Sequence, residues 1–344
     1  MVTRLVPPTP PADHTMGEQL HRYVLPKVPE LDLSDVQAIK VYGSPSLALL
    51  LNAKPLDAKL FNWRRPEFIR LDGFLHCVAS PGRDYTWHYA KLIATAGLIR
   101  GEQRPVLLTK PKRYEMDWFI DRWLPHSLPN ADVVVFGYVQ QLFGLEAEGV
   151  PWNRCHGFGW KRIDVAGASV LLLGCEFSYW GDLAGSLTAA ILRRGLTSWV
   201  LYVGKLGSLD PSLAPNQWLA TGQSSVVDGV PFTWRGRLQY VRPTGRMLRE
   251  IFHVTVPSVI DETREWAGEA SQSCQVVDPE IGHIARAAVK AGASFDYLHL
   301  VTDNLVKDFD QGLYDERSKH VASQRKSLVM EAEQMIRRGI IQTC

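Results

Sequence analysis

Cysteine is scarce in this sequence, and it follows no paired spacing. The five cysteines are Cys77, Cys155, Cys175, Cys274 and Cys344, and no CxxC pair occurs. An odd number of scattered cysteines excludes a disulfide framework and a structural zinc site. We therefore expect a reducing environment, and a cytoplasmic location fits best.

A strong charge of one sign and a long apolar run are also missing. Lys plus Arg number 38 and Asp plus Glu number 36, which argues against a nucleic-acid coat or a polybasic membrane binder. The apolar stretch at residues 165–174 is the longest, and it is far shorter than the ~20 residues that span a bilayer. Residues 1–15 lack the apolar core of a signal peptide. We expect a protein without nucleic-acid or membrane partners.

What the sequence does contain is an ordinary globular composition. It has 344 residues, of which 46% are hydrophobic and 22% charged, enough to bury a core without disulfides or metals. We expect three parts: a Pro-rich N-terminal arm at 1–35, an N-terminal α/β portion at 36–160, and a core at 161–344.

Strands alternate with helices along most of the chain. The apolar periodicity predicts strands at 36–42, 67–80 (a pair), 104–108, 131–137, 169–174, 198–203 and 295–301, and a hairpin within 217–242. It predicts helices at 47–51, 87–98, 114–124, 183–194, 280–291 and 321–340. This alternation indicates an α/β fold whose sheet has parallel strands, with helices on its faces.

Glycine or polar residues follow several predicted strands. They occur at 43–44, 174–176, 204–207 and 302–304, and an acidic segment at 277–280 opens a helix. In open α/β sheets ligands bind at the carboxyl ends of the strands. We expect a small-molecule site there, with 204–207 forming a glycine loop.

Three of these segments resemble a known family when they are read together. Residues 276–304 read VVDPEIGHIARAAVKAGASFDYLHLVTDN, and residues 200–216 read VLYVGKLGSLDPSLAPN. With the strand and Ala-rich helix at 169–191, they resemble the purine nucleoside phosphorylase and methylthioadenosine nucleosidase superfamily over roughly 165–320. The resemblance implies a three-layer, nucleoside-phosphorylase-like mixed sheet flanked by helices, with an enlarged N-terminal α/β portion.

The resemblance also implies roles for two carboxyl groups. Asp303 would protonate a purine base as the N-glycosidic bond breaks, because a carboxyl with a raised pKa can act as a general acid. Glu280 would accept hydrogen bonds from the ribose hydroxyls. Taken singly, each has a structural explanation: Asp303 could cap a loop, and Glu280 could favour the helix dipole.

Further substrate contacts follow from the same resemblance. The backbone of Gly204 and Gly207 would approach the substrate closely, and Gly43 would match the first glycine turn of the family. Asn304 is a candidate beside Asp303. The candidates for an aromatic residue stacked on the base are Phe252, Trp180 and Trp234.

The nucleophile is where the sequence departs from the family pattern. Tyr202 stands where phosphorylases commonly have an arginine, so hydrolysis and phosphorolysis both stay open. Glu176 is a candidate base that would activate water. The candidates for binding phosphate as a co-substrate are Arg64, Arg65 and Arg83, and no cofactor is expected.

Two other readings stay open. Tyr202 and Lys205 are consistent with a nucleoside-binding protein on the same fold that has lost turnover. An unrelated two-domain α/β glycosyltransferase is the other reading, and in that case Asp303 would not share a pocket with Glu280 and Gly204. Pockets in this superfamily often border a subunit interface, so we expect a homo-oligomer, with a dimer as the first choice.

Overall fold

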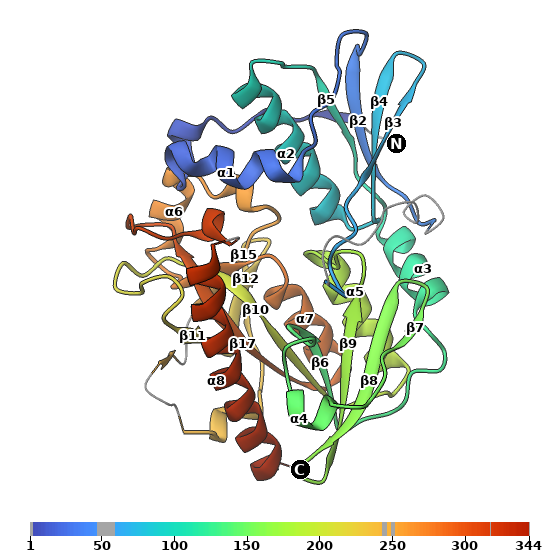
Figure 1. Cartoon of the computed structure of the whole chain (residues 1–344), viewed down its shortest axis with the longest axis vertical. Coiled ribbons are helices and arrows are strands. Elements are labelled where there is room, and N and C mark those ends of the chain that lie inside the picture. The colour runs from blue at the N-terminus through green and yellow to red at the C-terminus, as the bar shows by residue number, and fades with distance from the viewer. Residues whose placement is uncertain (1–2, 47–58, 243–245, 249–251, 317, 344) are drawn as a thin grey trace.

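Two β-sheets organise the chain in the computed structural model, which describes residues 3–46, 59–242, 246–248, 252–316 and 318–343 (Figure 1). The smaller sheet has five strands in the order β1-β5-β2-β4-β3. The larger sheet has twelve strands. Nine of them run in the order β13-β12-β15-β16-β10-β6-β9-β8-β7, while β17 pairs with β10 and β11, and β14 pairs with β11.

The strands of the smaller sheet are β1 (Thr3–Leu5), β2 (Ala38–Gly43), β3 (Glu67–Leu71), β4 (Phe74–Ala79) and β5 (Val106–Thr109). Those of the larger sheet are β6 (Val133–Gly137), β7 (Asn153–Cys155), β8 (Phe158–Val165), β9 (Ala168–Cys175), β10 (Trp199–Ser208), β11 (Leu219–Ala220), β12 (Ser224–Val227), β13 (Val230–Thr233), β14 (Met247–Leu248), β15 (Phe252–Thr255), β16 (Val276–Asp278) and β17 (Ser294–Asn304). The α-helices are α1 (Leu20–Val24), α2 (Arg83–Arg100), α3 (Arg113–Trp123), α4 (Gly144–Ala147), α5 (Asp182–Arg193), α6 (Arg264–Ala270), α7 (Ile281–Ala291) and α8 (Lys319–Thr343).

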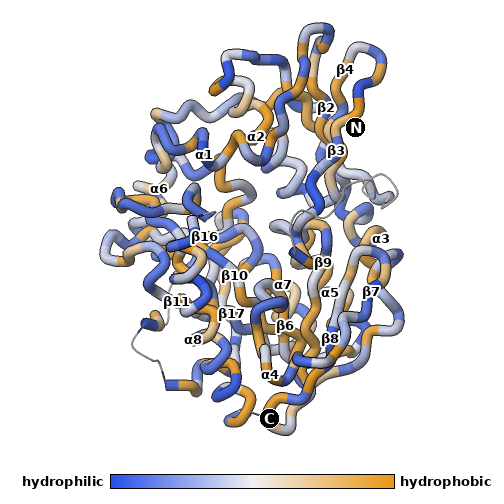
Figure 2. Tube along the Cα trace, viewed as in Figure 1, coloured by the Kyte–Doolittle hydropathy of each residue, from blue (hydrophilic) through white to orange (hydrophobic). Residues whose placement is uncertain are grey.

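Helices cover both faces of the larger sheet. On one face α3, α5 and α7 share an apolar core through residues such as Phe119, Leu187 and Ile284. On the other face α8 packs through Leu328 and Ile336. Figure 2 shows hydrophobic residues gathered along inner strands such as β9. The sheet is mixed, with β10 parallel to β6 and β17 and β8 antiparallel to β9, which confirms the predicted three-layer α/β class.

The Pro-rich N-terminus packs on the body of the molecule. Residues 11–27 form short helices, and Leu20 and Val24 are fully buried in the core that α2 shares with the smaller sheet. The Thr9 hydroxyl donates a hydrogen bond of 3.1 Å to the carbonyl of Ile260. The described part of the Pro-rich segment therefore lies against the body of the molecule, because its apolar side chains enter a core.

The two sheets divide the chain at a different place from the expected boundary at residue 160. Strand β6 lies inside the larger sheet, where Val134 pairs with Val200 of β10 and Leu171 of β9. Strands β7 and β8 extend the same sheet. The N-terminal unit built on the smaller sheet therefore ends before Val133.

The expected glycine loop at 204–207 is wrong, because β10 continues through it to Ser208. Strand β10 pairs in parallel with β17 along this stretch, with one register shift between Leu206 and Gly207. A Cβ atom at Gly204 would lie only 2.7 Å from Nε2 of His299. Glycine at this position therefore allows two strands to approach, rather than a turn to form.

The remaining predicted strands and helices are confirmed, with ends displaced by a few residues. The hairpin turn falls at Asp228-Gly229, between β12 and β13. The helix expected at 47–51 lies outside the described residues. Within the described residues, no helix combines the length and the apolar character that a membrane span requires.

Candidate active site

A cavity of about 330 Å³ lies where the N-terminal unit meets the larger sheet. Its floor comes from the carboxyl ends of β6, β9, β10, β16 and β17, the edge of an α/β sheet where ligands bind. Tyr23 of α1 and Tyr85, His88 and Tyr89 of α2 contribute the opposite wall. The N-terminal unit therefore helps to close the cavity, which has the size of a small-molecule site.

Asp303 reaches this cavity from the end of β17. The residue is only 9% exposed, and its Oδ1 accepts a hydrogen bond of 2.9 Å from the Thr302 hydroxyl. Burial raises the pKa of Asp303 to about 6, although the Thr302 hydrogen bond and the charges of Arg325 and Lys205 oppose this. A carboxyl of this kind still holds its proton in a fraction of the molecules at neutral pH, as a general acid requires.

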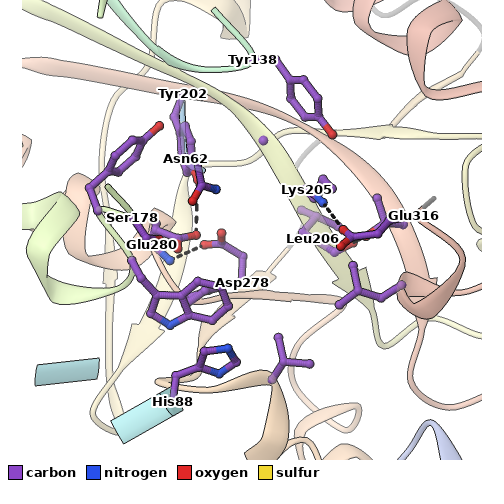
Figure 3. A pocket seen from close by; sticks show the side chains of 18 of the residues that line it. Asn62, His88, Tyr138, Ser178, Tyr202, Lys205, Leu206, Asp278, Glu280 and Glu316 are labelled. Carbon is purple, nitrogen blue, oxygen red and sulfur yellow. Dashed lines mark hydrogen bonds and ion pairs between the residues drawn. The ribbon is translucent and has the colours of Figure 1, made fainter. Parts of the chain in front are cut away.

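Glu280 lines the same cavity from the N-terminus of α7. The Tyr202 hydroxyl donates to its Oε2 over 3.3 Å, and the Gly181 backbone N–H donates to Oε1 over 3.4 Å (Figure 3). Burial, followed by the charge of Asp278, holds the pKa of Glu280 well above its usual range. Both hydrogen bonds are long, so the carboxyl can exchange them for the hydroxyls of a ligand.

Asp278 fixes the backbone that carries Glu280. Its Oδ1 accepts hydrogen bonds from the N–H groups of Glu280 and Ile281, at 2.8 and 2.6 Å. The Nε2 atoms of His253 and His299 lie 3.5 and 3.7 Å from its carboxylate oxygens. Burial by itself would raise the pKa of Asp278, but these partners outweigh burial and hold it at about 2. Asp278 is therefore a charged cap on the helix that positions Glu280.

A third carboxyl that the sequence analysis did not single out, Glu262, also lines the cavity. It follows the 3-10 helix Val259–Asp261, and it is 4% exposed. Burial and the nearby charge of Asp303 hold the pKa of Glu262 well above its usual range. The available signal was an acidic pair after a strand, which is too common a pattern to mark a site.

The structure brings together several of the residues predicted for the site. Asp303, Glu280, Gly204, Gly207 and Arg65 all line the cavity. Trp180 lines it too, with its ring stacked on His88 at a centroid distance of 4.3 Å. The arrangement counts against the glycosyltransferase reading, which requires Asp303 to lie apart from Glu280 and Gly204.

The carboxylate expected to activate water does not line this cavity. The Glu176 Oε2 atom accepts hydrogen bonds of 2.9 and 2.7 Å from Arg64, and Arg154 lies 3.6 Å from Oε1. Arg64 is engaged in the same ion pair and does not line the cavity. Because the charges of Glu176 and Arg64 satisfy each other, we withdraw both from the set of site residues.

Five further predicted residues also lie away from the cavity. Gly43 ends β2 in the smaller sheet, against Pro111 and Pro81. Phe252 is 57% exposed on β15, and Arg83 is exposed at the start of α2. The Asn304 amide donates to the carbonyls of Asp210 and Leu213, so it shapes a loop. The stacking candidate Trp234 is also away from the cavity, packed in the core of the larger sheet.

The part of the chain that the structure describes holds no group of three or more His, Cys, Asp or Glu side chains arranged to bind a metal ion. The lining of the cavity includes carboxyls, phenols and cationic side chains.

Comparisons with known proteins return structures of the superfamily that the motifs predict. A 5'-methylthioadenosine/S-adenosylhomocysteine nucleosidase from Colwellia psychrerythraea is 13% identical, with a TM-score of 0.45 over 60% of this chain and 92% of its own. The corresponding nucleosidase from Campylobacter jejuni is 9% identical, with a TM-score of 0.48 over 62% and 100%. A uridine phosphorylase from Vibrio fischeri is 12% identical, with a TM-score of 0.48 over 59% and 90%.

Sequence comparison gives a relative whose name states a different activity. No model of a known protein family matches the chain. Oxidoreductase cns1 of Cordyceps militaris is 24% identical over 330 residues, which cover 80% of this chain and 40% of that protein. The chain thus spans about two fifths of the length of this curated relative.

Proposed function

We propose that this protein binds a purine-type nucleoside or nucleotide and cleaves its N-glycosidic bond. The observation that carries the proposal is the placement of two buried carboxyls, Asp303 and Glu280, in the wall of one cavity. Both lie in the segment 276–304, which resembles the nucleoside phosphorylase superfamily.

Asp303 supplies the proton that the leaving base needs. As the bond between sugar and base breaks, positive charge develops on the ribose and negative charge on the purine. A purine anion leaves poorly unless a ring nitrogen, N7, is protonated. With a pKa of about 6, Asp303 is suited to donate that proton and to recover it from solvent afterwards.

Glu280 holds the sugar while this happens. Tyr202 and Gly181 each donate a long hydrogen bond to one oxygen of its carboxyl, and the 2'- and 3'-hydroxyls of ribose can replace these bonds. Burial favours the protonated form of Glu280, but the positive charge that develops on the ribose favours its ionised form, whose hydrogen bonds are stronger than those between neutral groups. This contact favours ribose over deoxyribose and stabilises the cationic sugar.

A nucleoside-binding protein without turnover is the second candidate, and one observation favours it. The carboxylate expected to activate water, Glu176, is held by Arg64 outside the cavity. In the cavity, the β10 position after Gly204 carries Lys205, which pairs with Glu316 at 3.1 Å. A water or phosphate nucleophile would have to be oriented by other groups, such as the hydroxyl of Tyr138.

The test is incubation of the purified protein with adenosine, guanosine, inosine and their 5'-monophosphates, with and without inorganic phosphate. Chromatography would follow the free base and the sugar product. Base release without phosphate establishes a hydrolase, and release only with phosphate establishes a phosphorylase.

Binding without release, measured by calorimetry on the same panel, would support the second candidate. Absence of both binding and release would overturn the proposed function.

A further inference from the structure

Four cationic side chains line the cavity. They are Lys27, Lys59, Arg65 and Lys205. Figure 3 shows Lys205, with its partner Glu316, on the opposite side of the cavity from Glu280 and Asp278. Three of the four come from residues 27–65, outside the segment whose motifs resemble the superfamily.

One carboxylate, Glu316, lies close to two of the four cations. Glu316 lies 3.1 Å from the Lys205 ammonium and 3.9 Å from that of Lys27. Within the described residues, Lys59 makes neither a hydrogen bond nor an ion pair. Arg65 Nη1 donates to the backbone carbonyls of Asn62 and Arg64, at 3.0 and 3.1 Å. Those carbonyls hold the guanidinium in place without neutralising it.

The electrostatics of Lys59 reflect this excess of positive charge. Although Lys59 is an exposed residue, the protein around its ammonium lowers its pKa to about 8, and the charges of Arg65 and Lys205 lower it further than that of Glu316 raises it. An anion bound among these groups would relieve the repulsion that they now exert on one another.

We infer that the cavity takes a phosphorylated nucleoside, and that Lys59, Arg65 and Lys205 bind its phosphate. The inference rests on the proposed function, which places base and sugar at Asp303 and Glu280. A guanidinium can bind two phosphate oxygens at once, while the lysines act as point charges. The N-terminal unit thus selects the substrate class, and the larger sheet carries the chemistry.

The experiment compares each nucleoside with its own 5'-monophosphate. Calorimetry at pH 7 gives the Kd of adenosine, guanosine and inosine and of AMP, GMP and IMP for the wild type and for K59Q/R65Q. We expect at least one monophosphate to bind about 10-fold or more tightly than its nucleoside to the wild type. In K59Q/R65Q this ratio falls toward one.

Two further variants serve as controls. K290Q/K326Q removes the same amount of charge from exposed positions on α7 and α8, and it should keep the wild-type ratio. K59Q alone, which breaks no hydrogen bond of the described structure, should lower the ratio several-fold even if the double variant folds poorly.

Equal affinity for nucleoside and monophosphate in the wild type would overturn the inference, as would a preference that survives in K59Q/R65Q. A third arm titrates inorganic phosphate, which can supply the same chemistry as a free co-substrate. Suppose that K59Q/R65Q binds inorganic phosphate more weakly than the wild type does, while the wild type shows no preference for monophosphates. The cations then bind phosphate as a co-substrate, and the inference is wrong. If the wild type prefers monophosphates but releases no base, the proposed cleavage is contradicted and the inference about the phosphate is not.

Discussion

At the scale of single residues, the buried carboxyls of the site differ in their pKa. Asp303 and Asp278 lie at the ends of two strands of one sheet, and both are almost fully buried. Burial raises the pKa of Asp303 to about 6, whereas hydrogen bonds and two histidines hold that of Asp278 at about 2. One is suited to donate a proton, and the other is a permanent charge that caps a helix.

The first prediction concerns the acid. Asp303→Asn removes the proton donor but keeps the shape of the side chain and its hydrogen bond from Thr302. Cleavage should fall ~10²–10⁴-fold while nucleoside or nucleotide binding is kept. Kinetics and calorimetry on the same preparation test this, with the exposed Asp310→Asn as the matched control. Unchanged turnover in Asp303→Asn would remove the acid assignment.

The second prediction is the pH dependence of cleavage. Because the protonated form of Asp303 is the active one, kcat/KM should decline as pH rises through about 6. A rate profile between pH 5 and pH 9 should contain this limb in the wild type and lose it in Asp303→Asn. If kcat/KM still declines with rising pH in the variant, the decline belongs to another titrating group, and Glu262 is the first to examine.

At the scale of elements, the close approach of β10 and β17 shapes the floor of the cavity. Their pairing runs from Trp199 with Ser294 to Ser208 with Asn304. The absence of a side chain at Gly204 lets His299 lie beneath the strand, where Tyr202 meets it edge-on at a centroid distance of 4.5 Å. The two strands thus place Tyr202 and Asp303 in the same cavity.

The third prediction follows from that approach. In Gly204→Ala the added methyl would meet the His299 ring at 2.7 Å, so the free energy of unfolding should fall by about 1–3 kcal/mol. Gly268→Ala, in helix α6 with open space around its Cβ, should be neutral or slightly stabilising. Chemical denaturation of both variants tests this. If Gly204→Ala were as stable as the wild type, the two strands would be able to move apart without a loss of stability.

At the scale of the whole molecule, the segment after β15 joins the two units. His14 Nε2 donates to the carbonyl of Val259 over 2.9 Å, and His88 Nδ1 lies 2.8 Å from the Ser258 hydroxyl. Glu262 belongs to this segment, so the contacts that dock the N-terminal unit also set the position of a cavity carboxyl.

The fourth prediction uses His14, whose pKa burial lowers to about 4. The unfolded chain binds a proton near pH 6.5 and the folded chain does not, so this histidine costs stability as pH falls. Between pH 7 and pH 5 the stability advantage of wild type over His14→Gln should shrink by about 2 kcal/mol. Denaturation curves at both pH values test this, and a constant difference would contradict a buried neutral His14.

The sequence by itself determined the elements and the two motifs of the site. Asp303 and Glu280 were singled out by the resemblance of residues 276–304 to the nucleoside phosphorylase superfamily, and the apolar periodicity around them placed one at the end of a strand and the other at the start of a helix. The α/β class followed from the same periodicity.

The tertiary structure decided which side chains meet. Arg64 neutralises Glu176 across 112 positions of sequence, and Glu262, Lys59 and Arg65 reach the cavity from segments that no local pattern connects to Asp303. The glycines of 204–207 have the composition of a turn, but pairing with β17 makes them a strand. These contacts join segments that are far apart in the sequence, and periodicity within one segment carries no information about its distant partners.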